Sequence, residues 1–237
     1  MLKSKKMNYL ITPPNTHYDN GLGITADNFQ NAAKVLKQQE ASTDSILPIC
    51  YLQRHAIELY LKSFIVILHK RYGVPYGMGF SNDKPAIKTN DKWVLLSKVH
   101  NLSDLYQHFI AIHSDLLDKL PTTTDWKLPK AAEKKIQLVS GSDPKSTYFR
   151  YPDASNTVQD SNKQNIQKES MESILKKSKL TNEPIKCVLM YDDNDEITAT
   201  YNIKSLPMPN VLKALDDLNK LFYGMHAALR YEVTNGT

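Results

Sequence analysis

Charged and imidazole side chains gather on one stretch of the chain. Arg54, Glu58 and Lys62 recur at every fourth position, and His55 follows Arg54 directly. Residues four apart share one face of an α-helix, so the three charges should form a ridge that stabilises the helix by roughly 0.3 kcal/mol per ion pair. The same ridge could bind a phosphate or set the register of a dimer. Because the surrounding residues are largely apolar, we expect the ridge to be partly enclosed and its charges to be paired.

Two residues farther along the chain are further candidates. His100 precedes a predicted helix, where an imidazole can act as a general base or as a hydrogen-bonding residue at the helix start. Arg150 lies between Phe149 and Tyr151, and we expect these two rings to anchor the segment in the core. Arg150 should then either pair with an acid, Glu58 being the first choice, or bind a phosphate through its planar guanidinium group.

The candidate binding residues are therefore Arg54, His55, Glu58, Lys62, His100 and Arg150. No residue is assigned a catalytic role, since the sequence contains no phosphate-binding loop, dinucleotide-binding fingerprint, nucleophile elbow or kinase signature. No metal-ligand spacing occurs either, and no cofactor is expected. The two cysteines, Cys50 and Cys187, lie in apolar stretches and are interpreted as buried free thiols.

Helical periodicity accounts for most of the chain. Helices are predicted over about 25–39, 45–72, 100–120, 129–141 and 209–231, with a shorter one near 169–177. The helix over 45–72 is apolar on nearly all sides, which is typical of a central helix in a bundle. Residues 73–97 carry glycine, proline and mixed charges and are predicted to be a loop.

A second periodicity interrupts the helices near the end of the chain. Apolar and polar residues alternate over 185–203 around an acidic turn, which predicts a β-hairpin. The polar stretch 153–168 is predicted to be a linker. The sequence thus predicts a mainly α protein, an up-and-down helical bundle with a β-hairpin insertion before the last helix. Residues 1–24 form an irregular N-terminal arm in this prediction, and 25–237 form one bundle domain.

The overall composition bears on the partners and the cellular compartment that we expect. The net charge is +5 with an isoelectric point near 8.9, but acidic and basic residues are interspersed, so charge alone does not indicate nucleic-acid binding. No signal peptide is visible, and the longest apolar run is far too short to cross a bilayer. We expect a cytoplasmic protein without a membrane partner.

An ordered set of short motifs resembles a known superfamily. The segment from Arg54 to Lys62 is followed by His100-Asn101-Leu102 and then by Phe149-Arg150-Tyr151-Pro152. This order resembles bacterial HEPN-like proteins (the higher eukaryote and prokaryote nucleotide-binding superfamily), in which an R-x-x-x-E-L-x-L-K helix precedes an H-D-L helix and sometimes an F-R-Y-P segment. The resemblance covers about residues 25–152. Asn101 stands where the family usually has an acid.

The resemblance implies a helical bundle that often forms a homodimer and works on, or beside, RNA or nucleotides. Many members are toxins, defence proteins or inactive relatives of these. The catalytic members are metal-independent ribonucleases in which an arginine is followed, after four to six residues, by a histidine. No arginine of this chain has a histidine at that spacing.

Three functions therefore stay open. The first is a non-catalytic or unassigned HEPN-like protein that binds RNA, a nucleotide or a protein partner, in a defence or toxin–antitoxin setting. The second is a divergent ribonuclease that uses Arg54, His55, Glu58 or His100. The third is a structural interaction module that docks through an exposed hairpin edge. We also expect a homodimer, because the helix over 45–72 has more apolar surface than one short bundle can cover.

Overall fold

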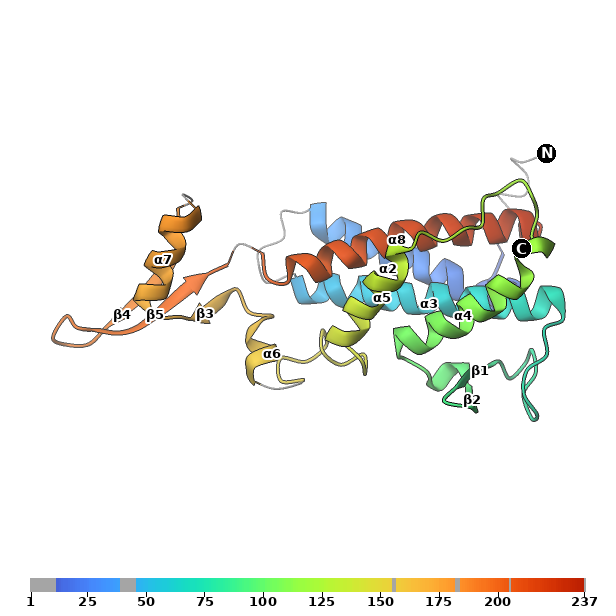
Figure 1. Cartoon of the computed structure of the whole chain (residues 1–237), viewed down its shortest axis with the longest axis horizontal. Coiled ribbons are helices and arrows are strands. Elements are labelled where there is room, and N and C mark those ends of the chain that lie inside the picture. The colour runs from blue at the N-terminus through green and yellow to red at the C-terminus, as the bar shows by residue number, and fades with distance from the viewer. Residues whose placement is uncertain (1–11, 39–45, 155–156, 182–183, 205, 237) are drawn as a thin grey trace.

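The computed structural model describes residues 12–38, 46–154, 157–181, 184–204 and 206–236. The fold is mainly α, as predicted, and Figure 1 shows a bundle of helices with an arm that projects from one end. The bundle consists of α2 (Leu22–Gln38), α3 (Ile46–Tyr72), α4 (Leu102–Leu116), α5 (Ala131–Ser142) and α8 (Pro209–Ala228). None of the helices in these ranges is long and apolar enough to cross a membrane.

The central helix of the bundle is α3, which packs against α2, α4 and α8. Every residue from 56 to 69 is buried, and the ring of Phe64 contacts Phe109 of α4 and Phe222 of α8, with ring centroids 5.3 and 5.6 Å apart. The apolar surface of α3 is therefore covered by helices of the same chain. The sequence-based reason for expecting a dimer does not hold, and the dimer itself stays a prediction.

Two local devices fix the ends of helices near the candidate residues. Gly73 follows α3 with a φ of 63°, a left-handed conformation that glycine adopts without steric cost and that ends the helix. Asn101 caps α4, since its Oδ1 accepts the backbone N–H groups of Ser103 at 2.8 Å and Asp104 at 3.1 Å. This cap fixes the position of His100, the residue before it.

A first sheet lies in the region predicted to be a loop. Strands β1 (Ala86–Thr89) and β2 (Lys92–Leu95) pair antiparallel. The two residues between them, Asn90 and Asp91, have φ angles of 46° and 60°, the conformation of a tight hairpin turn whose twist matches the strands. The loop prediction for 73–97 is wrong over these residues, because four-residue strands are too short to display an alternating pattern.

The projecting arm contains the predicted β-hairpin. Strands β4 (Cys187–Tyr191) and β5 (Ile197–Ile203) pair antiparallel, and β3 (Ile166–Lys168) adds to the other side of β5, giving the order β3-β5-β4. Helix α7 (Met171–Thr181) lies between β3 and β4 in the chain and also belongs to the arm. Cys187 is exposed, so its interpretation as a buried thiol is wrong.

The stretch 153–168, predicted to be a linker, contains regular structure in the part that the structure describes, 153–154 and 157–168. It contains α6 (Thr157–Ser161) and ends in β3. Lys163 is buried there; its Nζ lies 2.6 Å from Asp160 Oδ1 and donates to the Tyr151 carbonyl oxygen at 2.9 Å. The predicted N-terminal arm is also partly built into the fold, because Asp19 is buried and α2 begins at Leu22; residues 1–11 lie outside the described ranges.

Candidate functional site

Arg54 is the centre of a buried ion network. Its side chain is fully buried, and Nη1 donates to Glu58 Oε2 at 2.6 Å. Nε lies 3.1 Å from Asp143 Oδ2, an ion pair without hydrogen-bond geometry, and Nη2 donates to the carbonyl oxygen of His100. One guanidinium group thus joins α3 to the start of α4 and to the residue that follows α5.

Glu58 receives two further partners on its other oxygen. Oε1 accepts Lys62 Nζ at 2.8 Å and is 2.9 Å from His100 Nδ1. Burial acts to raise the pKa of Glu58, but Lys62, Arg54 and the hydrogen bond to His100 together bring it below its usual value. The carboxylate is therefore ionised, and the predicted pairing along the ridge is confirmed.

Asp143, the second carboxylate, organises the segment that follows it. Its Oδ1 accepts the backbone N–H groups of Thr147 at 2.7 Å and Tyr148 at 2.9 Å, while Oδ2 faces Arg54. We call Arg54, Glu58, Lys62, His100 and Asp143 the Arg54 network. Its side chains are at most 7% exposed except that of His100, which is 50% exposed. Within this network, His100 is therefore the one side chain that solvent can reach.

Three partly buried aromatic rings and one exposed cation lie near the surface beside the network. The His55 ring is stacked on Tyr51, with centroids 5.9 Å apart and planes 7° apart. It is nearly perpendicular to the Phe29 ring of α2, with centroids 4.6 Å apart. The guanidinium carbon of Arg150 lies 5.8 Å from the Tyr51 ring centroid. We call Phe29, His55, Tyr51 and Arg150 the aromatic–arginine strip. Burial and then the nearby cations lower the pKa of His55, although Glu58 opposes this, so its ring is neutral at neutral pH.

Arg150 does not pair with Glu58, contrary to prediction. The side chain is exposed, Nε donates to the Ser146 carbonyl oxygen, and among the described residues Arg150 forms no ion pair. The reason is that Arg54, Lys62 and His100 already occupy both oxygens of Glu58. Of the two flanking rings, Phe149 is buried as expected, but Tyr151 is 53% exposed.

The six predicted site residues therefore separate into two groups. Arg54, Glu58 and Lys62 are enclosed with His100 at their margin, whereas His55 and Arg150 belong to the surface strip. Sequence reasoning missed Asp143 and Tyr51. The Asp143-Pro144 pair indicates a turn but names no partner, and Tyr51 resembles any other core-facing aromatic of the predicted helix.

A second buried polar cluster attaches the N-terminal segment to the bundle. Asp19 accepts Ser63 Oγ at 2.5 Å and the backbone N–H of Gly23 at 2.8 Å, and its Oδ2 lies 3.7 Å from His226 Nε2. Burial acts to raise the pKa of Asp19, but the hydrogen bonds from His226, Ser63 and Gly23 lower it to about 2. All of these side chains are enclosed, so the cluster is structural.

A histidine pair joins α3, α4 and the first hairpin. His69 Nδ1 lies 2.9 Å from the Val74 carbonyl oxygen, which requires a proton on Nδ1. His108 Nδ1 accepts the backbone N–H of Lys88 at 3.2 Å, so its proton is on Nε2. The 3.2 Å contact between the two Nε2 atoms is then a hydrogen bond from His108 to His69. Burial, with a smaller effect of His69, lowers the pKa of His108 to about 4.

Comparison of the whole chain with known proteins adds no relative to this description. No protein-family model, no curated protein and no solved structure matches the chain.

Proposed function

We propose that the protein binds a ligand that carries both a nucleobase and a phosphate, single-stranded RNA or a nucleotide, at the aromatic–arginine strip. The observation that carries the proposal is the exposed guanidinium group of Arg150 over the Tyr51 ring, which stacks on His55, whose ring in turn contacts Phe29. The proposed role is binding without cleavage.

The chemistry of the strip suits such a ligand. Bases stack on aromatic rings and on guanidinium planes whatever their sequence, with about 1–3 kcal/mol per base. The terminal amino groups of Arg150 form no hydrogen bond to any described residue, and a guanidinium group with free donors matches two phosphate oxygens. A base on the strip and a phosphate at Arg150 would therefore use both features at once.

The Arg54 network supports the proposed site from beneath. Arg54 ties α3, which carries Tyr51 and His55, to Asp143, whose hydrogen bonds set the start of the segment that ends in Arg150. Membership of the HEPN superfamily is itself a proposal, and it favours the same class of ligand. The buried charges of the Arg54 network hold the aromatic–arginine strip in position, and the strip binds the ligand.

Fluorescence anisotropy tests the proposal with two probes, a labelled single-stranded oligoribonucleotide and a labelled adenine nucleotide. We expect saturable binding of at least one probe that weakens as salt rises. Tyr51→Leu keeps the apolar contact but removes the stacking surface, and it should weaken binding roughly tenfold. Comparing the probes separates RNA from a free nucleotide as the ligand. If neither probe binds, the proposal is wrong, and a protein partner becomes the better account of the strip.

One arrangement favours a second candidate function, RNA cleavage. His100 is held by Glu58 through Nδ1 at 2.9 Å while half of its side chain is exposed, which is the arrangement of a carboxylate-oriented general acid or base. On the binding proposal, the protein leaves RNA intact in the presence of EDTA. Cleavage that persists in EDTA and is abolished by His100→Ala would replace the binding proposal with metal-independent ribonuclease activity.

A further inference from the structure

The outer edge of strand β4 has no partner in the described part of the chain. The sheet order β3-β5-β4 places β4 at one side, and its sequence, Cys-Val-Leu-Met-Tyr, contains neither a charge nor a proline. Met190 pairs with Ala199 and Tyr191 with Ile197, so the extra residue of the irregularity, Thr198, belongs to β5. Exposed edge strands normally carry charges, prolines or bulges that prevent pairing. This strand lacks all three.

The backbone hydrogen bonds show which groups face outward. The Lys186 carbonyl oxygen accepts the Ile203 N–H at 2.9 Å, and the Asp192 N–H donates to the Glu196 carbonyl oxygen at 3.0 Å. Inward and outward residues alternate along a strand of an antiparallel ladder. Cys187, Leu189 and Tyr191 therefore direct their N–H and C=O groups towards the free edge.

We propose that a second copy of this chain pairs with β4, antiparallel and centred on Leu189. This two-fold register places Leu189 opposite its own counterpart and Cys187 opposite Tyr191 of the second copy, so outward groups meet outward groups. The pairing includes every residue of β4, since the two ends of the strand, Cys187 and Tyr191, are equally far from Leu189. The same register places Lys186 opposite the second copy's Asp192, and this charge complementarity at both ends selects a copy of the chain as the partner.

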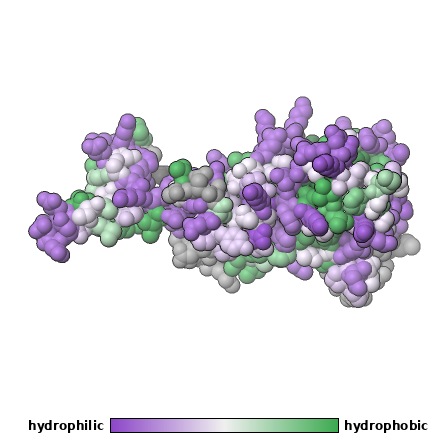
Figure 2. Space-filling view, turned by 90° about the horizontal axis from the view of Figure 1, so that it is seen from below, coloured by the Kyte–Doolittle hydropathy of each residue, from purple (hydrophilic) through white to green (hydrophobic). Residues whose placement is uncertain are grey.

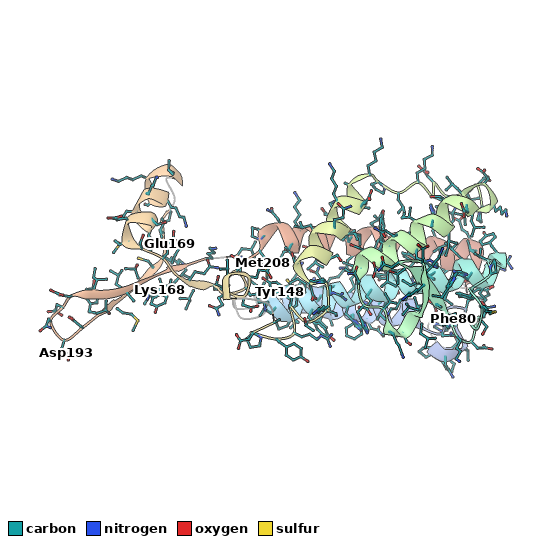
Figure 3. The ribbon with its side chains drawn as sticks, turned by 60° about the horizontal axis from the view of Figure 1, so that its bottom comes forward. Phe80, Tyr148, Lys168, Glu169, Asp193 and Met208 are labelled. Atoms are coloured by element: carbon teal, nitrogen blue, oxygen red, sulfur yellow. The ribbon has the colours of Figure 1, made fainter. Side chains whose placement is uncertain are left out.

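The surroundings of the strand suit this partner. Val188, Met190 and Ile197 are 41%, 51% and 48% exposed on the sheet, and Figure 2 shows apolar residues at the surface of the arm. In Figure 3 the arm extends from the bundle, with Asp193 at its tip and Tyr148 where it joins. An antiparallel pair of arms therefore places the two bundles at opposite ends of the pair.

Disulfide trapping tests the register. In a Cys187→Ser background, Val188→Cys combined with Met190→Cys places each new thiol opposite its counterpart in a non-hydrogen-bonded pair, where Cα atoms are about 4.5 Å apart and within reach of a disulfide. We expect a covalent dimer on mild oxidation. Val188→Cys alone is the matched control and should cross-link far more slowly. Equal cross-linking of the two variants, or none in either, would overturn the proposed register.

Sedimentation velocity on the full chain without RNA tests the charge pairing. Lys186→Glu places an acid opposite the second copy's Asp192, and it should weaken self-association by roughly tenfold or more. Lys168→Glu makes the same charge change at the opposite edge of the same sheet, in β3, and should leave self-association unchanged. A wild-type protein that stays monomeric at high micromolar concentration, or equal effects of the two variants, would refute the proposal. Neither result depends on whether the strip binds RNA.

Discussion

Arg54 and Arg150 carry the same charge in opposite surroundings. Arg54 is fully buried, hydrogen-bonded to Glu58 and a backbone carbonyl oxygen and ion-paired with Asp143, so its guanidinium group is out of reach of a ligand in solvent. Arg150 is exposed and lies over the Tyr51 ring. A buried ion pair is costly to break because the remaining charge stays desolvated. The first arginine therefore contributes to stability, and the second is available for binding.

Replacing Arg54 tests the structural half of this assignment. Arg54→Met leaves two buried carboxylates short of a partner and should lower the free energy of unfolding by about 3–5 kcal/mol. Arg150→Met removes an exposed side chain and should change it by less than about 0.5 kcal/mol. Urea denaturation measures both. Equal losses in the two variants would mean that the network is not what holds α3, α4 and the 143–151 segment together.

The sequence could predict part of the Arg54 network. Helical spacing brings Arg54, Glu58 and Lys62 together whatever the rest of the fold does, so their pairing is predictable. Asp143 comes from a distant loop, and only tertiary packing aligns it with Arg54. The predicted bond between Arg150 and Glu58 is wrong for the same reason, since sequence spacing does not show which cations reach a carboxylate first.

At the scale of elements, the His69–His108 pair makes the packing of α3, α4 and the β1–β2 hairpin dependent on pH. The hydrogen bond from His108 Nε2 requires His69 to be neutral, and the Lys88 N–H donated to Nδ1 requires His108 to be neutral. In the unfolded chain each histidine binds a proton below about pH 6.5. In the folded protein burial lowers both pKa values, that of His108 to about 4.

Stability should therefore fall in acid. Between pH 6.5 and 4 the unfolded chain binds a proton at His108 that the folded protein does not. Lowering the pH through this range therefore lowers the free energy of unfolding by roughly 2 to 3 kcal/mol. Above about pH 7 His108 is neutral in both states, and none of this stability is lost. His108→Asn, whose Oδ1 can still accept the Lys88 N–H, should flatten this part of the pH profile. Thermal unfolding at a series of pH values measures the slope. An unchanged slope in the variant would exclude His108 as its source.

Helices α2 and α8 can approach closely because Gly23 has no side chain. A Cβ on Gly23 would lie 1.9 Å from His226 Nε2, and that ring is buried between Asp19 and Asp27. Gly23→Ala should destabilise the protein by about 1–3 kcal/mol, measured by denaturation. Gly224→Ala in α8 is the matched control: a Cβ there meets nothing within 4 Å, so it should stabilise by about 0.5–1 kcal/mol. Two losses of similar size would contradict this account of the contact.

Elements were predictable in proportion to their length. The helices of the bundle span several turns, and their apolar periodicity survives any uncertainty at the ends. The β4–β5 hairpin was predictable because alternation runs along both of its strands. Strand β3 has three residues and β1 and β2 have four each, so no period can be seen, and a pairing partner decides whether such segments form strands.

At the scale of the whole molecule, the bundle and the arm have separate roles in this account. The bundle encloses the Arg54 network and presents the strip at its surface, while the arm projects from one end with a free strand edge (Figure 1). The sequence predicted a bundle and a hairpin but not that the hairpin would extend away from the helices. Between the two, Lys163 is buried and bonded to Asp160 and to the Tyr151 carbonyl oxygen, in a segment that composition alone presents as a polar linker.

The most direct test of the binding proposal is the affinity for a labelled single-stranded oligoribonucleotide of two matched arginine variants. Arg150→Met removes the cation of the strip, whereas Arg71→Met makes the same change at another exposed position, near the end of α3. We expect Arg150→Met to weaken binding by roughly tenfold or more, while Arg71→Met stays within about twofold of wild type. Equal affinities of the two variants would show that the strip is not the binding site.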